Sequence, residues 1–220
     1  MKRSPVQWIE IDAYRPRPDR LRAVAEVLDD GGLVAFPTDT TWVVAADAQA
    51  RGAADLLRGL RSQMGGAAEL RAPDDKPMSL MCADIAAAAT YVLMDQPQFR
   101  LVRKLLPGPY TVILPASRQV PRQLQSKRRA VGVRIPDHLV ASGLLQACRG
   151  PLLVATCHTP GGLLLSASTE VVDALGGSLR AVVETDPIVA EPTTVVDWTG
   201  DAPVLIRAGR GEVHDDWKTA

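Results

Sequence analysis

The residues best suited to chemistry include a cluster of oxygen-bearing side chains after an apolar segment. Residues 33–36 are apolar and run into Pro37, and Thr38, Asp39, Thr40 and Thr41 follow before apolar residues resume at Trp42. Proline fixes its own backbone angle, and threonine and aspartate side chains hydrogen-bond to nearby main-chain groups, so a turn accounts for part of this cluster. The remaining reason for it has to come from the rest of the chain.

Positive charge is concentrated in one segment, although the formal net charge of the chain is +0. Residues 118–134 hold six basic residues and no acidic one. Such charge binds phosphate backbones with a steep salt dependence and little sequence preference, and the low aromatic content of 4% disfavours base stacking on a single strand. RNA is therefore an expected ligand, and a solvated basic edge that steers a nucleotide inward is an equal alternative. The residues expected to bind RNA are Arg118, Arg122, Lys127, Arg128 and Arg129.

Several familiar kinds of site are not expected. The chain has no G-x-x-x-x-G-K-[ST] or G-x-G-x-x-G phosphate loop and no G-x-S-x-G nucleophile elbow. Its three histidines have no metal-site spacing to one another or to the cysteines, so no metal is expected. Its three cysteines are odd in number and form no C-x-x-C pair, so we expect them reduced and partly buried. The histidines are His138, His158 and His214, and the cysteines are Cys82, Cys148 and Cys157.

Composition indicates a globular protein. The 220 residues fit one large domain or two small ones, and 46% hydrophobic content fills a substantial core. The apolar runs are shorter than the roughly 20 residues that span a membrane. The first residues show no apolar stretch of signal-peptide length. We therefore expect a soluble, cytoplasmic protein without a membrane partner.

The elements that must position these residues alternate between helical and extended patterns. Apolar spacing predicts a helix from Asp19, as its cap, to Gly31. Residues 64–75 are rich in glycine, alanine and acidic residues without periodicity, which predicts a mobile loop or an ordinary exposed connection. Several strands are apolar on both faces, which predicts a mixed α/β class. The further predicted helices cover 50–63, 95–106, 138–148 and about 168–177. The predicted strands cover 33–36, 77–82, 110–116, 131–135, 151–156, 179–184, 193–198 and 202–208.

Six separated segments together resemble the YrdC-like family, whose best-known members are threonylcarbamoyl-AMP synthases. In chain order they are GGLVAFPTDTTW, KPMSLMCAD, LLPGPYTVILPAS, VGVRIPDHLV, PLLVATCHTPGG and TTVVDWTGDAPVLIRAG. The resemblance covers about residues 9–213. The runs VPRQLQSKRRAVGVRIP and WIEIDAYRPRP are most similar to the YciO branch.

The resemblance implies one twisted mixed α/β domain over residues 1–220 with a deep, positively lined cavity. The family's synthases condense L-threonine, bicarbonate and ATP into threonylcarbamoyl-adenylate and release pyrophosphate, with Mg²⁺ on the triphosphate and no tightly bound cofactor. A partner transferase then uses the adenylate to modify adenosine next to the anticodon of tRNA. Some members bind double-stranded RNA or tRNA, which adds to the RNA hypothesis above.

Carried over by matching motifs, the resemblance implies two sets of site residues. An arginine suits a carboxylate because its planar fork donates two parallel hydrogen bonds. Asp39 is expected to brace the turn. The alternatives are a turn hydroxyl for Thr40, an arginine paired with a surface carboxylate for Arg134, and ordinary polar residues of loops or strands for the others. The threonine-binding set is Thr40, Arg134, Thr156 and Thr193. The nucleotide-binding set is Arg61, Arg71, Lys76, His158, Ser166 and Arg207.

The chain also departs from the family's motifs. The K-x-R pair is represented by Arg61 and Gln63, so Arg71 is the expected replacement cation, and His158 stands for the asparagine of S-x-N. The Y-G-L-G run is WVVA at 42–45, which narrows the expected pocket, and Met81 replaces a histidine. Loss of one charged partner in a closed site costs about 2–4 kcal/mol, or roughly 100-fold in rate.

Three functions remain open from the sequence. The first is a synthase that joins a carbamoylated amino acid, threonine above all, to the α-phosphate of ATP. The second is a non-catalytic RNA-binding protein that retains the fold and its basic surface. The third is related chemistry on a smaller acyl group, such as plain carbamoyl.

Overall fold

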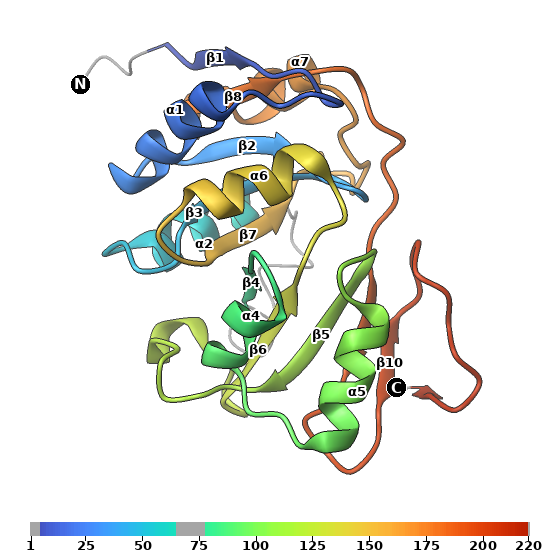
Figure 1. Cartoon of the computed structure of the whole chain (residues 1–220). Coiled ribbons are helices and arrows are strands. Elements are labelled where there is room, and N and C mark those ends of the chain that lie inside the picture. Colours follow the sequence, from blue (N-terminus) through green and yellow to red (C-terminus); the bar gives the residue numbers. More distant parts are fainter. Residues whose placement is uncertain (1–4, 65–77, 220) are drawn as a thin grey trace.

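One twisted sheet runs through the molecule (Figure 1). The computed structural model describes residues 5–64 and 78–219. In this part of the chain 11 strands follow the order β1-β8-β2-β3-β7-β4-β6-β5-β9-β10-β11, with parallel and antiparallel neighbours. The strands are β1 (Gln7–Glu10), β2 (Val34–Pro37), β3 (Trp42–Asp47), β4 (Ser79–Met81), β5 (Tyr110–Pro115), β6 (Ala130–Arg134), β7 (Leu152–Thr156), β8 (Ala181–Glu184), β9 (Thr194–Asp197), β10 (Val204–Arg207) and β11 (Lys218–Thr219).

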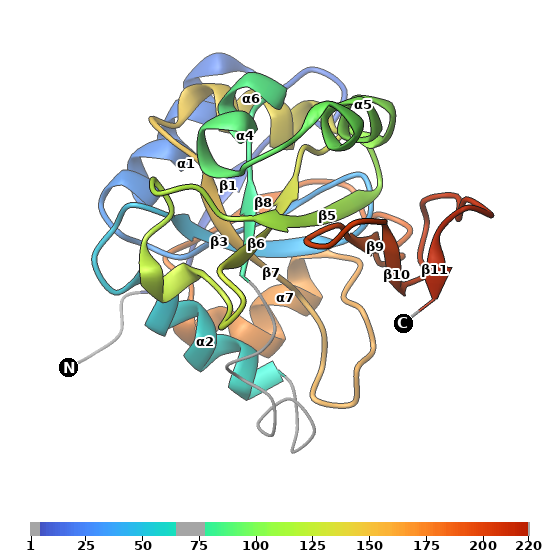
Figure 2. The ribbon, with the colours of Figure 1, turned by 90° about the horizontal axis from the view of Figure 1, so that it is seen from below.

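Helices cover both sides of this sheet (Figure 2). Seen from below, α1, α4, α5 and α6 lie on one side, and α2 and α7 lie on the other. The mixed α/β class expected from the sequence is therefore confirmed. The helices are α1 (Pro18–Asp29), α2 (Ala53–Met64), α4 (Ile85–Tyr91), α5 (Gln96–Leu105), α6 (Leu139–Ala147) and α7 (Ser168–Leu175), with short 3₁₀ turns η1 (Arg122–Leu124) and η2 (Gly176–Ser178).

The core consists of two apolar clusters. One packs α1 and α6 onto β2 and β3 through side chains such as Leu28, Phe36 and Leu144, each fully buried. The larger cluster contains Trp42 and Leu57 together with residues of α5 and α7. Because strands in the middle of the order are buried on both faces, their side chains are apolar throughout, as β2 shows.

Most predicted elements are present, and four were missed. The sequence analysis assigned nothing to β1, β3, α4 or β11. The run IAAAATY of α4 has no amphipathic repeat; Asp84 caps it by accepting a hydrogen bond from the Ala87 amide at 2.7 Å. Asp19 is not the cap of α1: the cap is Arg17, and Asp19 lies in the first turn, ion-paired with Arg17 at 3.1 Å. The predicted loop begins one residue too early, because Met64 is a buried helical residue, and 65–75 lie outside the described residues.

The cysteines are free thiols, as expected. Cys82 and Cys157 are buried and Cys148 is half-buried. Burial raises the pKa of Cys82 and of Cys148 to about 12 and raises that of Cys157 as well, so all three are inert thiols at neutral pH. Across residues 5–64 and 78–219, no helix has both the length and the apolar character needed to cross a bilayer.

A histidine caps α6, and this predicts a pH dependence of stability. His138 Nδ1 accepts a hydrogen bond from the Ala141 amide at 3.4 Å, which requires the neutral ring. Burial lowers the pKa of His138 from its ordinary 6.5; the charge of Arg134 also lowers it, whereas Asp39 and Asp137 raise it. Below pH 6.5 the unfolded chain therefore binds more protons at His138 than the folded chain does. The contribution of the neutral His138 to stability is complete above that pH and is lost as the pH falls towards the lowered pKa.

We expect His138→Asn to remove this loss, because asparagine caps a helix well at any pH in this range. Urea unfolding at about pH 7.5 and about pH 5.5 checks it. The wild-type free energy of unfolding should fall more than that of the variant between the two. Equal losses would show that His138 is not the titrating group.

A glycine allows the loop after β10 to approach β9 closely. A Cβ atom on Gly209 would lie 2.2 Å from the Pro192 carbonyl oxygen and 2.6 Å from the Thr193 carbonyl carbon, both backbone atoms. We expect Gly209→Ala to lower the free energy of unfolding by about 2 kcal/mol, because the backbone must shift. In the matched control Gly200→Ala, the new methyl has nothing within 4 Å, so the change should stay within about 0.5 kcal/mol in urea unfolding. A similar loss in both variants would refute the crowding argument.

Candidate functional site

The turn between β2 and β3 is built around the hydroxyl of Thr38. Its Oγ1 donates to the Thr41 carbonyl at 2.6 Å and accepts from the amides of Thr40 (3.2 Å) and Thr41 (3.1 Å). The bracing role that the sequence analysis gave to Asp39 therefore belongs to Thr38. The Asp39 carboxylate is therefore available to contact a residue outside the turn.

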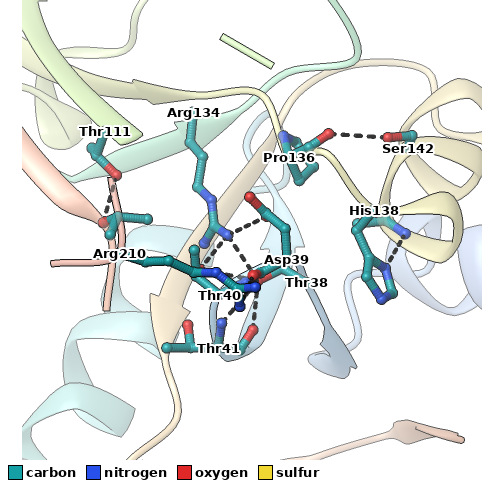
Figure 3. A network of polar contacts seen from close by, with 12 residues as sticks. Thr38, Asp39, Thr40, Thr41, Thr111, Arg134, Pro136, His138, Ser142 and Arg210 are labelled. Carbon is teal, nitrogen blue, oxygen red and sulfur yellow. Dashed lines mark hydrogen bonds and ion pairs between the residues drawn. The ribbon is translucent and has the colours of Figure 1, made fainter. Parts of the chain in front are cut away.

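Arg134, the last residue of β6, extends into this turn (Figure 3). Its Nη2 donates to Thr38 Oγ1 at 2.7 Å, to Asp39 Oδ1 at 2.8 Å and to Thr40 Oγ1. We call Thr38, Asp39, Thr40 and Arg134 the Arg134 cluster. The arginine is thus paired with a carboxylate, and that carboxylate is itself largely buried, with 12% of its side chain exposed.

The Arg134 cluster is shielded from solvent. Arg134 is 4% exposed and Thr40 is 0% exposed. Burial lowers the pKa of the Arg134 guanidinium from its ordinary value, the negative charge of Asp39 opposes this, and the positive charge of Arg207 adds to the lowering. Two buried polar atoms have no hydrogen-bond partner within the described residues: Arg134 Nε and Asp39 Oδ2.

The contact between Arg134 and the turn requires a strongly curved sheet. In the strand order, β3, β7 and β4 separate β2 from β6. Four strand spacings of about 4.8 Å would hold the turn and β6 roughly 19 Å apart in a flat sheet. Twist closes this gap and brings residues 94–96 positions apart in the chain within hydrogen-bond distance.

Two distant loops hold the turn from its main-chain side. The Glu191 amide donates to the Thr40 carbonyl at 2.8 Å, and Arg210 Nη1 donates to the Asp39 carbonyl at 2.8 Å. Figure 3 shows Arg210 reaching the turn. The loop after β8 and the loop after β10 therefore both contact the same turn, residues 38–41.

A second polar group consists of Thr111 on β5, Thr193 just before β9, and Arg207 on β10. The hydroxyls of Thr111 and Thr193 are 3.1 Å apart. Arg207 Nε and Nη2 donate to the Thr193 carbonyl at 3.2 and 3.0 Å, and Nη2 also donates to Thr193 Oγ1 at 3.1 Å. A shift of register between Leu205 and Arg207 lets the exposed Arg207 side chain turn back onto this threonine. Thr193 and Arg207, which were assigned to different ligand sets from the sequence, are thus in direct contact.

The remaining expected residues lie around the end of β7. Thr156 is half-buried and pairs with Val43 of β3. His158 is half-buried, with Nδ1 2.9 Å from the Thr159 carbonyl. The Ser166 hydroxyl donates to Glu170 at 3.1 Å, and the Ser166 carbonyl accepts from Trp42 Nε1 at 3.1 Å.

The departures from the family motifs have structural counterparts. Trp42 is buried in the larger apolar cluster. Val43 and Met81 are both buried in the other cluster, which packs α1 and α6 onto the sheet. Arg61, in the last turn of α2, directs Nη1 to Met78 Sδ at 3.5 Å. Arg71 and Lys76 lie outside the described residues.

The five expected RNA-binding residues lie on one connection, between β5 and β6. All five are exposed. Arg122 begins η1, and Arg129 has a positive φ of 54°. Arg128 is ion-paired with the buried Asp197 at 2.8 Å; for the other four, no ion pair forms within residues 5–64 and 78–219. Charge on this connection is therefore turned to solvent.

Three residues of the site were missed from the sequence: Thr38, Thr111 and Arg210. Thr38 belongs to the hydroxyl cluster after Pro37, but only its hydrogen bonds distinguish it from its neighbours. Arg210 follows Arg207 by three residues, and that spacing was the only local signal for it. Thr111 lies within an apolar strand, and only the contact between the two hydroxyls shows that it lies beside Thr193.

Comparisons with known proteins agree with the fold and with the resemblance. A family model described as telomere recombination, covering Sua5, YciO and YrdC, matches residues 26–209. The uncharacterized protein YciO of Escherichia coli is 30% identical over 94% of this chain and 97% of its own, and its crystal structure superposes with a TM-score of 0.86.

Threonylcarbamoyl-AMP synthases are more distant relatives. That of Pyrococcus abyssi is 25% identical over 86% of this chain, which spans about half of the synthase (54%). The crystal structure of P. abyssi Sua5 complexed with L-threonine has a TM-score of 0.83 at 23% identity, covering 97% of this chain and 62% of that one, and supports the fold. From sequence and structure together, this chain belongs to the Sua5–YciO–YrdC family.

Proposed function

We propose that this protein is a nucleotidyltransferase of the threonylcarbamoyl-AMP synthase type, which condenses L-threonine, bicarbonate and ATP into threonylcarbamoyl-adenylate for tRNA modification. The observation that carries the proposal is the Arg134 cluster: a buried guanidinium with two threonine hydroxyls beside it. Arg134 is paired with Asp39 in this cluster, and hydrogen bonds between a buried guanidinium and a carboxylate are strong because water competes poorly for them.

In this proposal the threonine end of the substrate meets Arg134. The guanidinium holds the carboxylate, and Thr40 orients the ligand from the turn. Thr156 and Thr193 supply further hydroxyls from the neighbouring strand ends. Holding the amino acid in one geometry lowers the entropic part of the barrier, and no covalent nucleophile is required.

In the same proposal, ATP lies beside the more exposed cations. Arg207 would contact phosphate, with Arg61, Ser166 and His158 beside it; Arg71 and Lys76 are proposed from the sequence alone. No group of three potential metal ligands occurs within the described residues. A Mg²⁺ ion that arrived with the triphosphate would supply charge neutralisation as pyrophosphate leaves. A transferase partner would take the product.

Pyrophosphate release tests this function. Purified protein with Mg²⁺ and ATP should release pyrophosphate only when both threonine and bicarbonate are added. Arg207→Gln should lower kcat/KM for ATP about 100-fold, because a charged donor to the phosphates is removed. Arg134→Lys should raise the KM for threonine about 10-fold or more, because lysine cannot form the fork.

The matched control is Arg149→Gln, whose arginine is 88% exposed in a surface ion pair with Asp29 and should leave the kinetics unchanged. No pyrophosphate release at millimolar substrates would refute the function. Release that requires carbamoyl phosphate and not threonine would instead favour the smaller acyl group.

RNA binding is a second candidate function, favoured by the exposed basic connection between β5 and β6. Four of its five cations make no ion pair within the described residues. Unpaired exposed cations are free to contact phosphates, which supply most of the sequence-independent affinity for nucleic acids. Double-stranded RNA and tRNA are the proposed ligands.

We expect the triple change of Arg118, Arg122 and Lys127 to glutamine to weaken binding to tRNA at least 10-fold at low salt. The slope of log Kd against log salt should fall by about 1 for each phosphate that the protein no longer neutralises, as measured by fluorescence anisotropy. A control triple change of the exposed Arg22, Arg51 and Arg149 should have little effect. Equal weakening by both triples would indicate nonspecific charge and not this connection.

A further inference from the structure

The two edges of the sheet differ in how well they are protected from other chains. β1 and β11 are the outer strands among residues 5–64 and 78–219, and Figure 1 shows β1 at an outer edge of the molecule. Edge strands present unpaired main-chain groups, which proteins shield with very short strands, charged side chains or a covering element. β11 has two residues and begins with Lys218, whereas β1 has four residues and carries Trp8, which is 41% exposed. The edge at β1 is therefore the one suited to pairing.

The ladder between β1 and β8 leaves every second residue of β1 with its main chain turned outward. The two strands are parallel, and the amides of Gln7 and Ile11 donate to the carbonyls of Arg180 and Glu184 at 3.0 and 2.9 Å. Because ladder bonds alternate along a strand, residues 7, 9 and 11 bond to β8, and residues 6, 8 and 10 direct their N–H and C=O groups away from it. β1 thus presents a row of outward donors and acceptors centred on Trp8.

We propose that β1 pairs with β1 of a second copy of this chain, antiparallel and centred on Trp8, to form a two-fold symmetric dimer with one continuous sheet. In this register Trp8 lies opposite Trp8 of the second copy, and Val6 lies opposite Glu10 of the second copy. All these residues have outward main-chain groups, so each opposed pair can exchange two hydrogen bonds. The inference does not depend on the proposed function.

The side chains of β1 suit this register. Ile9 is buried in the cluster with α1 and α6, so Trp8 projects from the opposite face of the sheet, the side of α2 and α7 (Figure 2). The two tryptophans would be directly opposite each other, where aromatic pairs stabilise a sheet. Glu10 is the one charged residue of β1, and its two copies would be about 14 Å apart, beyond a Debye length of about 8 Å. No like charges would therefore oppose each other along the pair.

The helix next to this edge carries charge of both signs, separated along its length. α1 contacts β1, and Figure 1 shows both at the same end of the molecule. Arg20 and Arg22 are exposed in the first half of α1, and Glu26 and the C-cap Asp30 are exposed towards its end. A two-fold axis perpendicular to the sheet makes the two copies of α1 antiparallel, so the basic half of each lies across from the acidic half of the other. This complementarity favours a second copy over an unrelated strand.

Sedimentation velocity of the full chain from about 2 to about 200 µM tests the dimer, because a strand pair of this length is small beside a standard interface of about 800 Å² per partner. The wild type should show a dissociation constant between about 1 and about 100 µM. Glu10→Pro should raise it at least about 10-fold, because proline removes the outward N–H of residue 10 and places its ring where the second copy would pair. The ladder to β8 does not use that N–H, so the strand itself should persist.

Glu10→Ala is the matched control, since it removes the same side chain and keeps the amide. Its dissociation constant should stay within about 3-fold of the wild-type value. Hydrogen exchange of the wild type gives a readout that needs no variant. The amides of Trp8 and Glu10 should exchange more slowly as the protein concentration rises, whereas that of Ile9 should be protected at every concentration.

Four results would overturn the inference. The wild type stays monomeric throughout this range, as expected if a strand of another protein covers the edge; Glu10→Pro dimerises as tightly as the wild type; or Glu10→Ala weakens the dimer as much as Glu10→Pro, which would assign the effect to the side chain. The fourth is a dimer in which the amides of Trp8 and Glu10 gain no protection, which would place the contact elsewhere. The first and fourth results stand even if Glu10→Pro does not fold.

Discussion

The hydrogen bonds from Arg134 to the β2–β3 turn are the constraint on which the rest of the site depends. They join the end of β6 to a turn that lies beyond three intervening strands. A flat sheet cannot make this contact, and an arginine buried to this degree cannot lack it without leaving a charge unpaired in a medium of low polarity. Sheet curvature, burial of the arginine and the shape of the turn therefore have to occur together.

This constraint explains the presence of Thr38, Asp39 and Thr40, three of the four successive oxygen-bearing residues of the turn. The Thr38 hydroxyl satisfies the main chain of the turn, which frees Asp39 to neutralise Arg134 and places Thr40 Oγ1 beside the same nitrogen. Thr38 alone would satisfy the main-chain hydrogen-bonding groups of the turn. The other two side chains are required by a cation that arrives from 94–95 residues further along the chain.

Local signals in the sequence predicted much of the fold. The amphipathic spacing of α1 and the apolar runs of β2, β5, β6 and β7 identify those elements, because period and burial are properties of short segments. α4 was missed because an alanine run has no polar face, and β3 because it continues directly from the turn.

For the site, the sequence singled out four residues that the structure places in two hydrogen-bonded pairs: Arg134 with Thr40, and Arg207 with Thr193. The pairing of Asp39 with Arg134 was not predictable, since it depends on the curvature of the whole sheet. Arg210 was missed for the same reason: its hydrogen bond to the turn spans 171 residues.

The two polar groups differ in how they meet solvent, and this difference bears on how a reaction with two substrates would proceed. The Arg134 cluster is buried and multiply hydrogen-bonded, so it is formed before any ligand arrives. Arg207 is exposed, and its bonds are to a threonine hydroxyl and a carbonyl, which a phosphate oxygen can replace as an acceptor. Under the proposed function, a rigid site would select the small amino acid, and a more adaptable rim would take the triphosphate. Burial lowers the pKa of Arg134 most, and the positive charge of Arg207 adds to the lowering. Under the proposed function, an anion bound between the two guanidiniums would offset the repulsion between them.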